Sequence, residues 1–79
     1  MNHKIDLHGL SIRKAVTKAE LFLIEASFDK NMHVEIITGK SGNMQEYIIK
    51  EILEPYKFEY YIPPNNTGMI IVCNNDLFS

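Results

Sequence analysis

Polar and apolar residues alternate in three short segments, at residues 4–7, 33–37 and 58–62, and a fourth segment, 69–73, is apolar throughout. Alternation with a period of two is typical of a strand with one buried face. Ile5 and Leu7 therefore share one face of the first strand, and Asp6 falls on the other. Strands covered on both faces are apolar nearly throughout, so this pattern predicts a sheet with one face partly open.

Two segments between these strands have apolar residues at helical spacing. The first helix is expected from residue 12 to about residue 29, with this stripe: Ile12, Ala15, Val16, Ala19, Leu23 and Ala26. Ser11 precedes it as a residue suited to capping the amino terminus of a helix. The second helix has a shorter stripe: Met44, Tyr47, Ile48, Ile52 and Leu53. Pro55 ends it, because proline has no amide hydrogen.

The resulting order is β-α-β-α-β-β. Strands that alternate with helices imply βαβ crossovers and parallel pairing, whereas the last two strands, joined by a short turn-rich loop, imply an antiparallel hairpin. We therefore expect one α/β domain over residues 1–79, a two-layer sandwich with a mixed four-stranded sheet and both helices on one face.

Composition restricts where such a domain works. The chain is 46% apolar and 23% charged, which is typical of an ordered globular protein. Cys73 is the only cysteine, so no internal disulfide can form and a reducing, cytoplasmic location is favoured. No apolar run approaches the roughly 20 residues that cross a bilayer, so no membrane association is expected. Cys73 is expected to be a small buried residue of the last strand.

Charge is unevenly distributed along the chain. The net charge of −2 weighs against strong binding to nucleic acid, because contacts to phosphates supply most of that affinity. Residues 1–18, however, contain four basic side chains and one acidic one, a net charge of +3, whereas the remainder has four basic and nine acidic ones, a net charge of −5. This distribution predicts a positive patch at one end of an acidic body.

Asp6 and His8 are the first candidates for chemistry. They are two residues apart at the carboxyl end of the first strand, where open α/β sheets place their ligand sites. An imidazole moves protons near neutral pH, and a neighbouring carboxylate can orient it, so the pair could act in general acid–base catalysis. A histidine that only ties the strand end to the next helix is the simpler alternative. A metal site formed by His3, Asp6 and His8 is a third interpretation.

The second candidate is the loop between the second strand and the second helix, which could bind a phosphate. Its glycines free the backbone so that N–H groups can converge on an anion, and Lys40 adds a positive charge. The spacing of a nucleotide-binding P-loop is absent, and an ordinary flexible connection is the alternative. The loop consists of Thr38, Gly39, Lys40, Ser41, Gly42 and Asn43.

Parallel pairing of the first two strands would bring both candidates to one edge of the sheet. His8 and Lys40 would then lie near the start of the first helix. Arg13, Lys14 and Lys18 in that helix would contact the flanking backbone of a nucleic acid. Among the aromatic residues, Tyr61 is expected on the open face, and the others are expected in the core: Tyr47, Phe58 and Tyr60.

The motif Asp6-Leu7-His8-Gly9, followed by an amphipathic helix, resembles the Leu-Asp-Leu-His-Gly motif of Smr (small MutS-related) domains. Thr38-Gly39-Lys40 resembles their second motif, Thr-Gly-x-Gly, although this chain has Ser41 in place of the second glycine and Gly42 one position later. Asn66-Thr67-Gly68 before the last strand also fits. The resemblance implies the fold of the carboxy-terminal domain of a bacterial translation initiation factor, binding of DNA or RNA, and endonuclease or nicking activity.

The leading hypothesis is therefore a nucleic-acid-binding Smr-like domain with DNA or RNA endonuclease activity, in which Asp6 orients His8. No cofactor is evident, and a requirement for Mg²⁺ is left open. One alternative is a non-catalytic module that binds nucleic acid or ribosomal RNA. Another is a protein-interaction domain that binds a partner, or a second copy of itself, through the open sheet face.

Overall fold

The computed structural model describes residues 2–29 and 31–75. The described chain forms four strands, two helices and one π-helical turn, in the expected order β-α-β-α-β-β. The elements are β1 (Asn2–Asp6), α1 (Ile12–Ala26), β2 (His33–Ile37), α2 (Gly42–Ile48), the π-helical turn η1 (Ile49–Leu53), β3 (Phe58–Tyr61) and β4 (Met69–Asn75).

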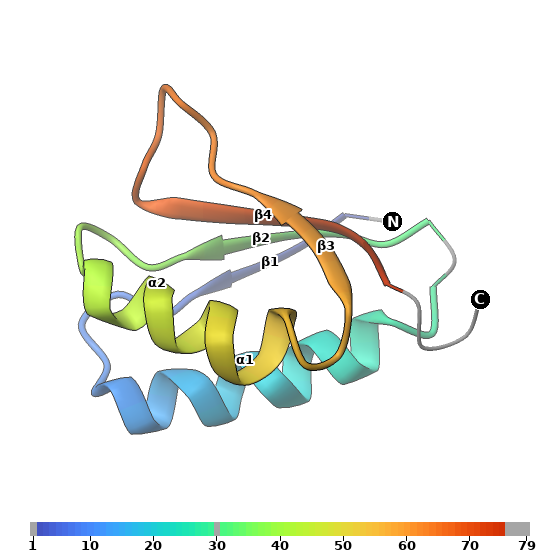
Figure 1. Ribbon diagram of the computed structural model, residues 1–79, viewed down its shortest axis with the longest axis horizontal. Helices are drawn as coiled ribbons and strands as arrows, with labels where there is room; N and C mark the ends of the chain where they lie inside the picture. The colour runs from blue at the N-terminus through green and yellow to red at the C-terminus, as the bar shows by residue number, and fades with distance from the viewer. Residues whose placement is uncertain (1, 30, 76–79) are drawn as a thin grey trace.

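The four strands form one mixed sheet in the order β1-β2-β4-β3. β1 and β2 are parallel, with Asp6 opposite Ile37, whereas β4 pairs antiparallel with both β2 and β3. Both helices lie on one face of the sheet, as Figure 1 shows. The predicted two-layer α/β architecture is therefore confirmed. In the described part of the chain, no helix is long and apolar enough to cross a membrane.

The core lies between the sheet and the helices. Val34 and Ile36 of β2 are fully buried, whereas the residues that alternate with them are only partly buried, as the sequence predicts: His33, Glu35 and Ile37. Small residues on α1, Ala15 and Ala19, are also fully buried and let this helix approach the sheet closely. The second helical segment contributes larger side chains to the same cluster: Met44, Ile48, Ile52 and Leu53.

The opposite face of the sheet has no helix over it. Because Ile5 packs on the core, strand alternation turns Lys4 and Asp6 toward this open face. Ile71, opposite Glu35 and Tyr61 in the strand pairing, is only 5% exposed although it stands outside the core cluster. Cross-strand neighbours thus shield this isoleucine.

Several boundaries differ from the sequence-based expectation. β1 spans Asn2–Asp6 rather than residues 4–7, and β3 ends at Tyr61 rather than at residue 62. α1 ends at Ala26 rather than near residue 29, where the Ser27 hydroxyl donates to the carbonyl of Ile24 at 2.6 Å. The hydroxyl of Ser11 does cap α1, as predicted, by accepting from the Lys14 amide. The turn η1 was not expected, and β4 continues to Asn75, two residues farther than predicted.

Two burial predictions were wrong, and one on the open face was right. Tyr47 is 51% exposed, because Met44 and Ile48 already occupy the inward side of α2. Cys73 is exposed, because Val72 points into the core and the next residue of a strand must point away. Tyr61 is 52% exposed on the open face, as expected. Phe58 is buried and Tyr60 packs partly buried against the core, also as expected.

A pair of identical substitutions on α1 tests the assignment of the core. Leu23 is fully buried, whereas Leu21, two residues earlier, is 66% exposed. We expect Leu23→Ala to lower the free energy of unfolding by about 2–5 kcal/mol, because it removes buried surface and leaves a cavity. Leu21→Ala should change it by no more than about 0.5 kcal/mol. Urea denaturation followed by circular dichroism measures both, and equal losses would contradict the assignment.

Candidate functional site

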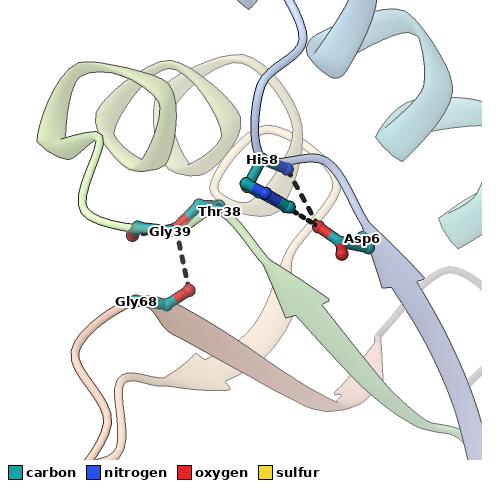
Figure 2. A network of polar contacts seen from close by, with 5 residues as sticks. All are labelled: Asp6, His8, Thr38, Gly39 and Gly68. Carbon is teal, nitrogen blue, oxygen red and sulfur yellow. Dashed lines mark hydrogen bonds and ion pairs between the residues drawn. The ribbon is translucent and has the colours of Figure 1, made fainter.

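Three loops meet at one edge of the sheet, where β1 and β2 end and β4 begins (Figure 2). A Cβ atom added at Gly39 would lie 3.2 Å from the Cβ of His8, so the first two loops are in direct contact. A Cβ atom at Gly68 would lie 2.9 Å from the carbonyl oxygen of Gly39, so the third loop is equally close. The expected convergence of His8 with the loop after β2 is therefore observed.

Asp6 and His8 form a hydrogen-bonded pair just beyond β1. Nδ1 of His8 lies 2.8 Å from Oδ1 of Asp6, and the backbone N–H of His8 donates to the same oxygen at 3.1 Å. An ionised carboxylate only accepts, so Nδ1 is the protonated ring nitrogen and Nε2 is left to face a ligand. The two side chains turn toward each other in Figure 2 and remain exposed, by 68% for His8 and 53% for Asp6.

This pairing also has an electrostatic effect. The hydrogen bond from the His8 ring, and secondarily that from its backbone, holds the pKa of Asp6 below the ordinary aspartate value. The carboxylate therefore stays ionised over a wider pH range and keeps the ring in one tautomer. The geometry is that of an oriented imidazole able to accept or donate a proton at Nε2.

The backbone amides of Thr38 and Gly39 do converge on an oxygen, but that oxygen belongs to the protein. The carbonyl of Gly68 accepts from the N–H of Thr38 at 2.9 Å and from that of Gly39 at 3.1 Å. Two of the N–H groups expected to bind a phosphate are therefore already engaged. Gly39 has φ +68°, which favours glycine, and this conformation helps to turn its amide toward Gly68.

Gln45 is a site residue that the sequence did not reveal. Its amide nitrogen donates to the hydroxyl oxygen of Thr38 at 2.9 Å and to the carbonyl of Thr67 at 2.6 Å. The hydroxyl of Thr38, a buried residue, lies 3.2 Å from the Gly68 carbonyl oxygen. Thr38 and Gln45 thus fasten the loops together rather than face a ligand. The partners of Gln45 lie 7 and 22 residues away, and only the fold brings Thr67 to this side chain, so no local motif indicated the bridge.

The rest of the predicted phosphate loop is exposed. Ser41 caps α2 by accepting from the Met44 amide at 3.2 Å, with φ −84°, so its backbone does not require glycine. The replacement of a glycine by serine here is therefore compatible with the loop. Lys40 and Gly42 line a hollow of about 420 Å³ together with Gly39, Gln45 and Thr67. Asn43 is exposed in the first turn of α2.

The basic residues of α1 lie elsewhere. Arg13, Lys14 and Lys18 are exposed and line a separate hollow of about 580 Å³ with Leu10 and Thr17. This hollow shares no lining residue with the one beside Lys40. The structure thus divides the predicted phosphate-binding residues into two groups, one at the loop edge and one on the outer surface of α1.

The proposed metal site of His3, Asp6 and His8 does not form. The His3 ring packs edge-on against Phe22 of α1, with ring centroids 5.9 Å apart, so it points to the helix side of the sheet. Asp6 is on the open side. Within residues 2–29 and 31–75, no group of three histidine, cysteine, aspartate or glutamate side chains is placed to hold a metal ion.

Comparison with known proteins adds no assignment. A scan against protein-family models finds no match, and a search of curated proteins finds no significantly similar sequence. The geometry described above is therefore the basis for any functional conclusion.

A pair of glycine substitutions tests the contact between the loops. Gly68→Ala would place a Cβ atom 2.9 Å from the Gly39 carbonyl oxygen, which is backbone and cannot rotate away. We expect it to lower the free energy of unfolding by about 1–3 kcal/mol. A Cβ atom at Gly42 meets nothing within 4 Å, so Gly42→Ala should stabilise the domain by about 0.4–1 kcal/mol. Thermal unfolding of both variants would refute the contact if Gly68→Ala were also stabilising.

The titration of Asp6 tests its bond to His8. In the wild type, carbon-detected NMR should give the Asp6 carboxyl a pKa below the ordinary value. His8→Ala should raise this pKa toward the ordinary value, because the ring makes the largest contribution to the lowering, while the backbone N–H remains. The ionised form is favoured by folding, so the associated stability is complete above the ordinary pKa and is lost as the pH falls through the lowered one. An unchanged Asp6 pKa in His8→Ala would contradict the bond.

Proposed function

We propose that this chain is a Smr-like nucleic-acid-binding domain that hydrolyses phosphodiester bonds of DNA or RNA. The observation that carries the proposal is the His8–Asp6 pair, which packs against Gly39 at the rim of a hollow that also contains Lys40. The pair provides an oriented group for proton transfer, and the lysine provides a positive charge for binding a phosphate. Hydrolysis of a phosphodiester needs both, and both are present at this edge of the sheet. The exposed thiol of Cys73 suits the reducing cytoplasm, where we place the domain.

In the proposed reaction, His8 acts as the general base. Its Nε2 accepts a proton from a water molecule as the water oxygen forms a bond to phosphorus. The bond from phosphorus to the leaving oxygen breaks, and that oxygen takes a proton from solvent or from the imidazolium. Asp6 holds the ring through Nδ1 and stabilises the imidazolium that forms, a contribution to the rate of roughly 10²–10⁴ for general acid–base catalysis.

Lys40 supports the binding step. Its side chain is exposed at the edge shared by the three loops and carries a positive charge that can attract a phosphate. The exposed residues Ser41, Gly42 and Asn43 begin α2 beside it, where amide hydrogens of a first helical turn lack intrahelical partners. This part of the loop, rather than Thr38 and Gly39, is the proposed phosphate contact.

Mg²⁺ does not enter the proposed steps. His3 points away from Asp6 and His8, and the described residues offer no other three-ligand group. The steps above are written for the chain's own side chains, and Mg²⁺ is a variable of the assay.

A non-catalytic nucleic-acid-binding module is the second candidate. The hydrogen bonds of the Gly68 carbonyl favour it, because this oxygen accepts from the amides of both Thr38 and Gly39. These two donors are then not available to stabilise the charge that develops on a phosphate under attack. In that case the same edge holds nucleic acid without cleaving it.

Substitution of two histidines separates the candidates. His8→Ala should abolish cleavage of labelled RNA, single-stranded DNA or supercoiled plasmid, with binding retained in gel-shift assays at low salt, with and without Mg²⁺. His33→Ala is the matched control, because His33 begins β2 and therefore lies at the opposite end of the sheet. It should leave cleavage within about twofold of the wild type, since it lies outside the proposed catalytic pair.

Other results would change the assignment. Binding without cleavage, equal in the wild type and His8→Ala, would establish the non-catalytic module. Cleavage that persists in His8→Ala would refute the role of the histidine. A lack of binding and cleavage would leave a protein-interaction domain, which sedimentation of the isolated chain would test through the formation of a salt-independent homodimer.

A further inference from the structure

The open face of the sheet contains a hollow of about 590 Å³ next to the proposed catalytic edge. The β3–β4 loop forms its wall and, in Figure 1, rises from the sheet on the side away from the helices. The volume lies within the roughly 300–1,000 Å³ that small-molecule sites occupy, so it is large enough for a single nucleotide. The lining residues are Lys4, Ile37, Gly39, Lys40, Asn65, Asn66, Thr67, Gly68 and Met69.

The floor of this hollow is apolar. Ile37 and Met69 face each other across the antiparallel pair of β2 and β4, and both are half-buried. Asp6, on the same side of the sheet, is the partner of Ile37 in β1, so the catalytic pair stands at the margin of this floor. The flat face of a nucleobase can pack on such an apolar floor. A phosphate backbone without its base would leave the floor exposed to water.

The rim of the hollow is positively charged. Lys4 and Lys40 both line it, and none of its lining residues is acidic, while the carboxylates of Asp6 and Glu35 lie beside Lys4 on the same face. This arrangement is notable in a chain whose net charge is −2. Two lysines beside an apolar floor complement a ligand that is apolar at its centre and anionic on either side, which is the chemistry of a nucleotide within a strand.

The wall provides hydrogen-bonding groups. Asn65 and Asn66 are exposed at the tip of the loop, and Oδ1 of Asn66 accepts from the Gly68 amide at 3.3 Å. That bond fixes the Asn66 side chain and leaves its NH₂ group available to donate. Amide side chains of this kind recognise the edges of bases, and the Watson–Crick edge is accessible only in an unpaired base.

Tyr61 supplies an aromatic surface beside the floor. It is paired with Ile71, two residues along β4 from Met69, and is therefore a diagonal neighbour of Met69 on the same face. Diagonal neighbours lie roughly 7–8 Å apart, a distance that an aromatic side chain spans. Its ring is 52% exposed, so a base can stack on it.

We infer that the open-face hollow receives one unpaired nucleotide adjacent to the phosphate held at the loop edge, and that the domain consequently selects single-stranded nucleic acid over continuous duplex. The inference rests on the proposed function. A base within a duplex reaches such a hollow only after it has been unstacked and unpaired, which disfavours duplex binding. The bound strand would therefore run across the open face in one orientation, with its phosphate near Lys40 and its next base stacked on Tyr61.

Two tyrosines provide a matched test. Fluorescence anisotropy would measure the binding of the full chain to a labelled 12-nucleotide single strand, as RNA and as DNA, and to a hairpin duplex of the same sequence. Tyr61→Ala should weaken single-strand binding by roughly 5- to 150-fold, the loss of one stacked base, and leave the weaker duplex binding unchanged. Tyr47→Ala is the control, because Tyr47 is 51% exposed but belongs to α2 on the helix side.

Mapping by ¹H–¹⁵N NMR gives a readout that needs no variant. Addition of the single strand should shift the amides of residues 65–69 and of Ile37, and not those of Val16 and Tyr47, which line a separate hollow between the helices. Equal affinity for single strand and duplex, together with unchanged single-strand affinity of the Tyr61→Ala variant, would overturn the inference. Cleavage that depends on His8 would in that case still support the proposed function. Failure to bind any of the three oligonucleotides would overturn both.

Discussion

The geometry of the loop edge depends on one carbonyl oxygen, that of Gly68, which accepts the amides of both Thr38 and Gly39. Only a residue without a Cβ atom lets this carbonyl approach so closely, because a methyl group there would lie 2.9 Å from the Gly39 carbonyl oxygen. Gly39 in turn lies against His8. The position of the catalytic candidate is therefore set by these two glycines and their shared hydrogen-bond acceptor on one side, and by the fully buried Leu7, which directly precedes His8, on the other.

The two faces of the sheet have different roles: one stabilises the fold and the other carries the exposed polar residues. One face buries a core of aliphatic side chains against α1 and α2, while the other remains partly polar and places Asp6, Lys4 and Tyr61 toward solvent. An acidic net charge coexists with a positively lined hollow because Lys4 and Lys40 come from separate segments that only the parallel pairing of β1 with β2 brings together. A net charge calculated over the chain cannot reveal such a juxtaposition.

The sequence predicted the element order, the layers and the meeting of His8 with the loop after β2, because alternation and helical periodicity are local and parallel pairing determines which strand ends adjoin. It did not predict the bridging role of Gln45, because this residue links Thr38, seven residues away, to Thr67, which is 22 residues away. The exposure of Cys73 was missed because an uninterrupted apolar run hides the alternation of faces. The amides of Thr38 and Gly39 were assigned to a ligand because their internal acceptor, Gly68, is thirty residues away.

The position of β4 between β2 and β3 affects how the domain folds. The β3–β4 hairpin and the β1-α1-β2 unit each contain pairings closer in sequence than that between β2 and β4, where residues 34–37 meet residues 69–72. The pairing of β2 with β4 joins these two units to each other, so it requires both β2 and β4 to be in place. The carbonyl of Gly68 reaches Thr38 only in that step. A partly folded chain would therefore lack the loop edge altogether, and the fully folded domain alone would present the histidine beside its hollow.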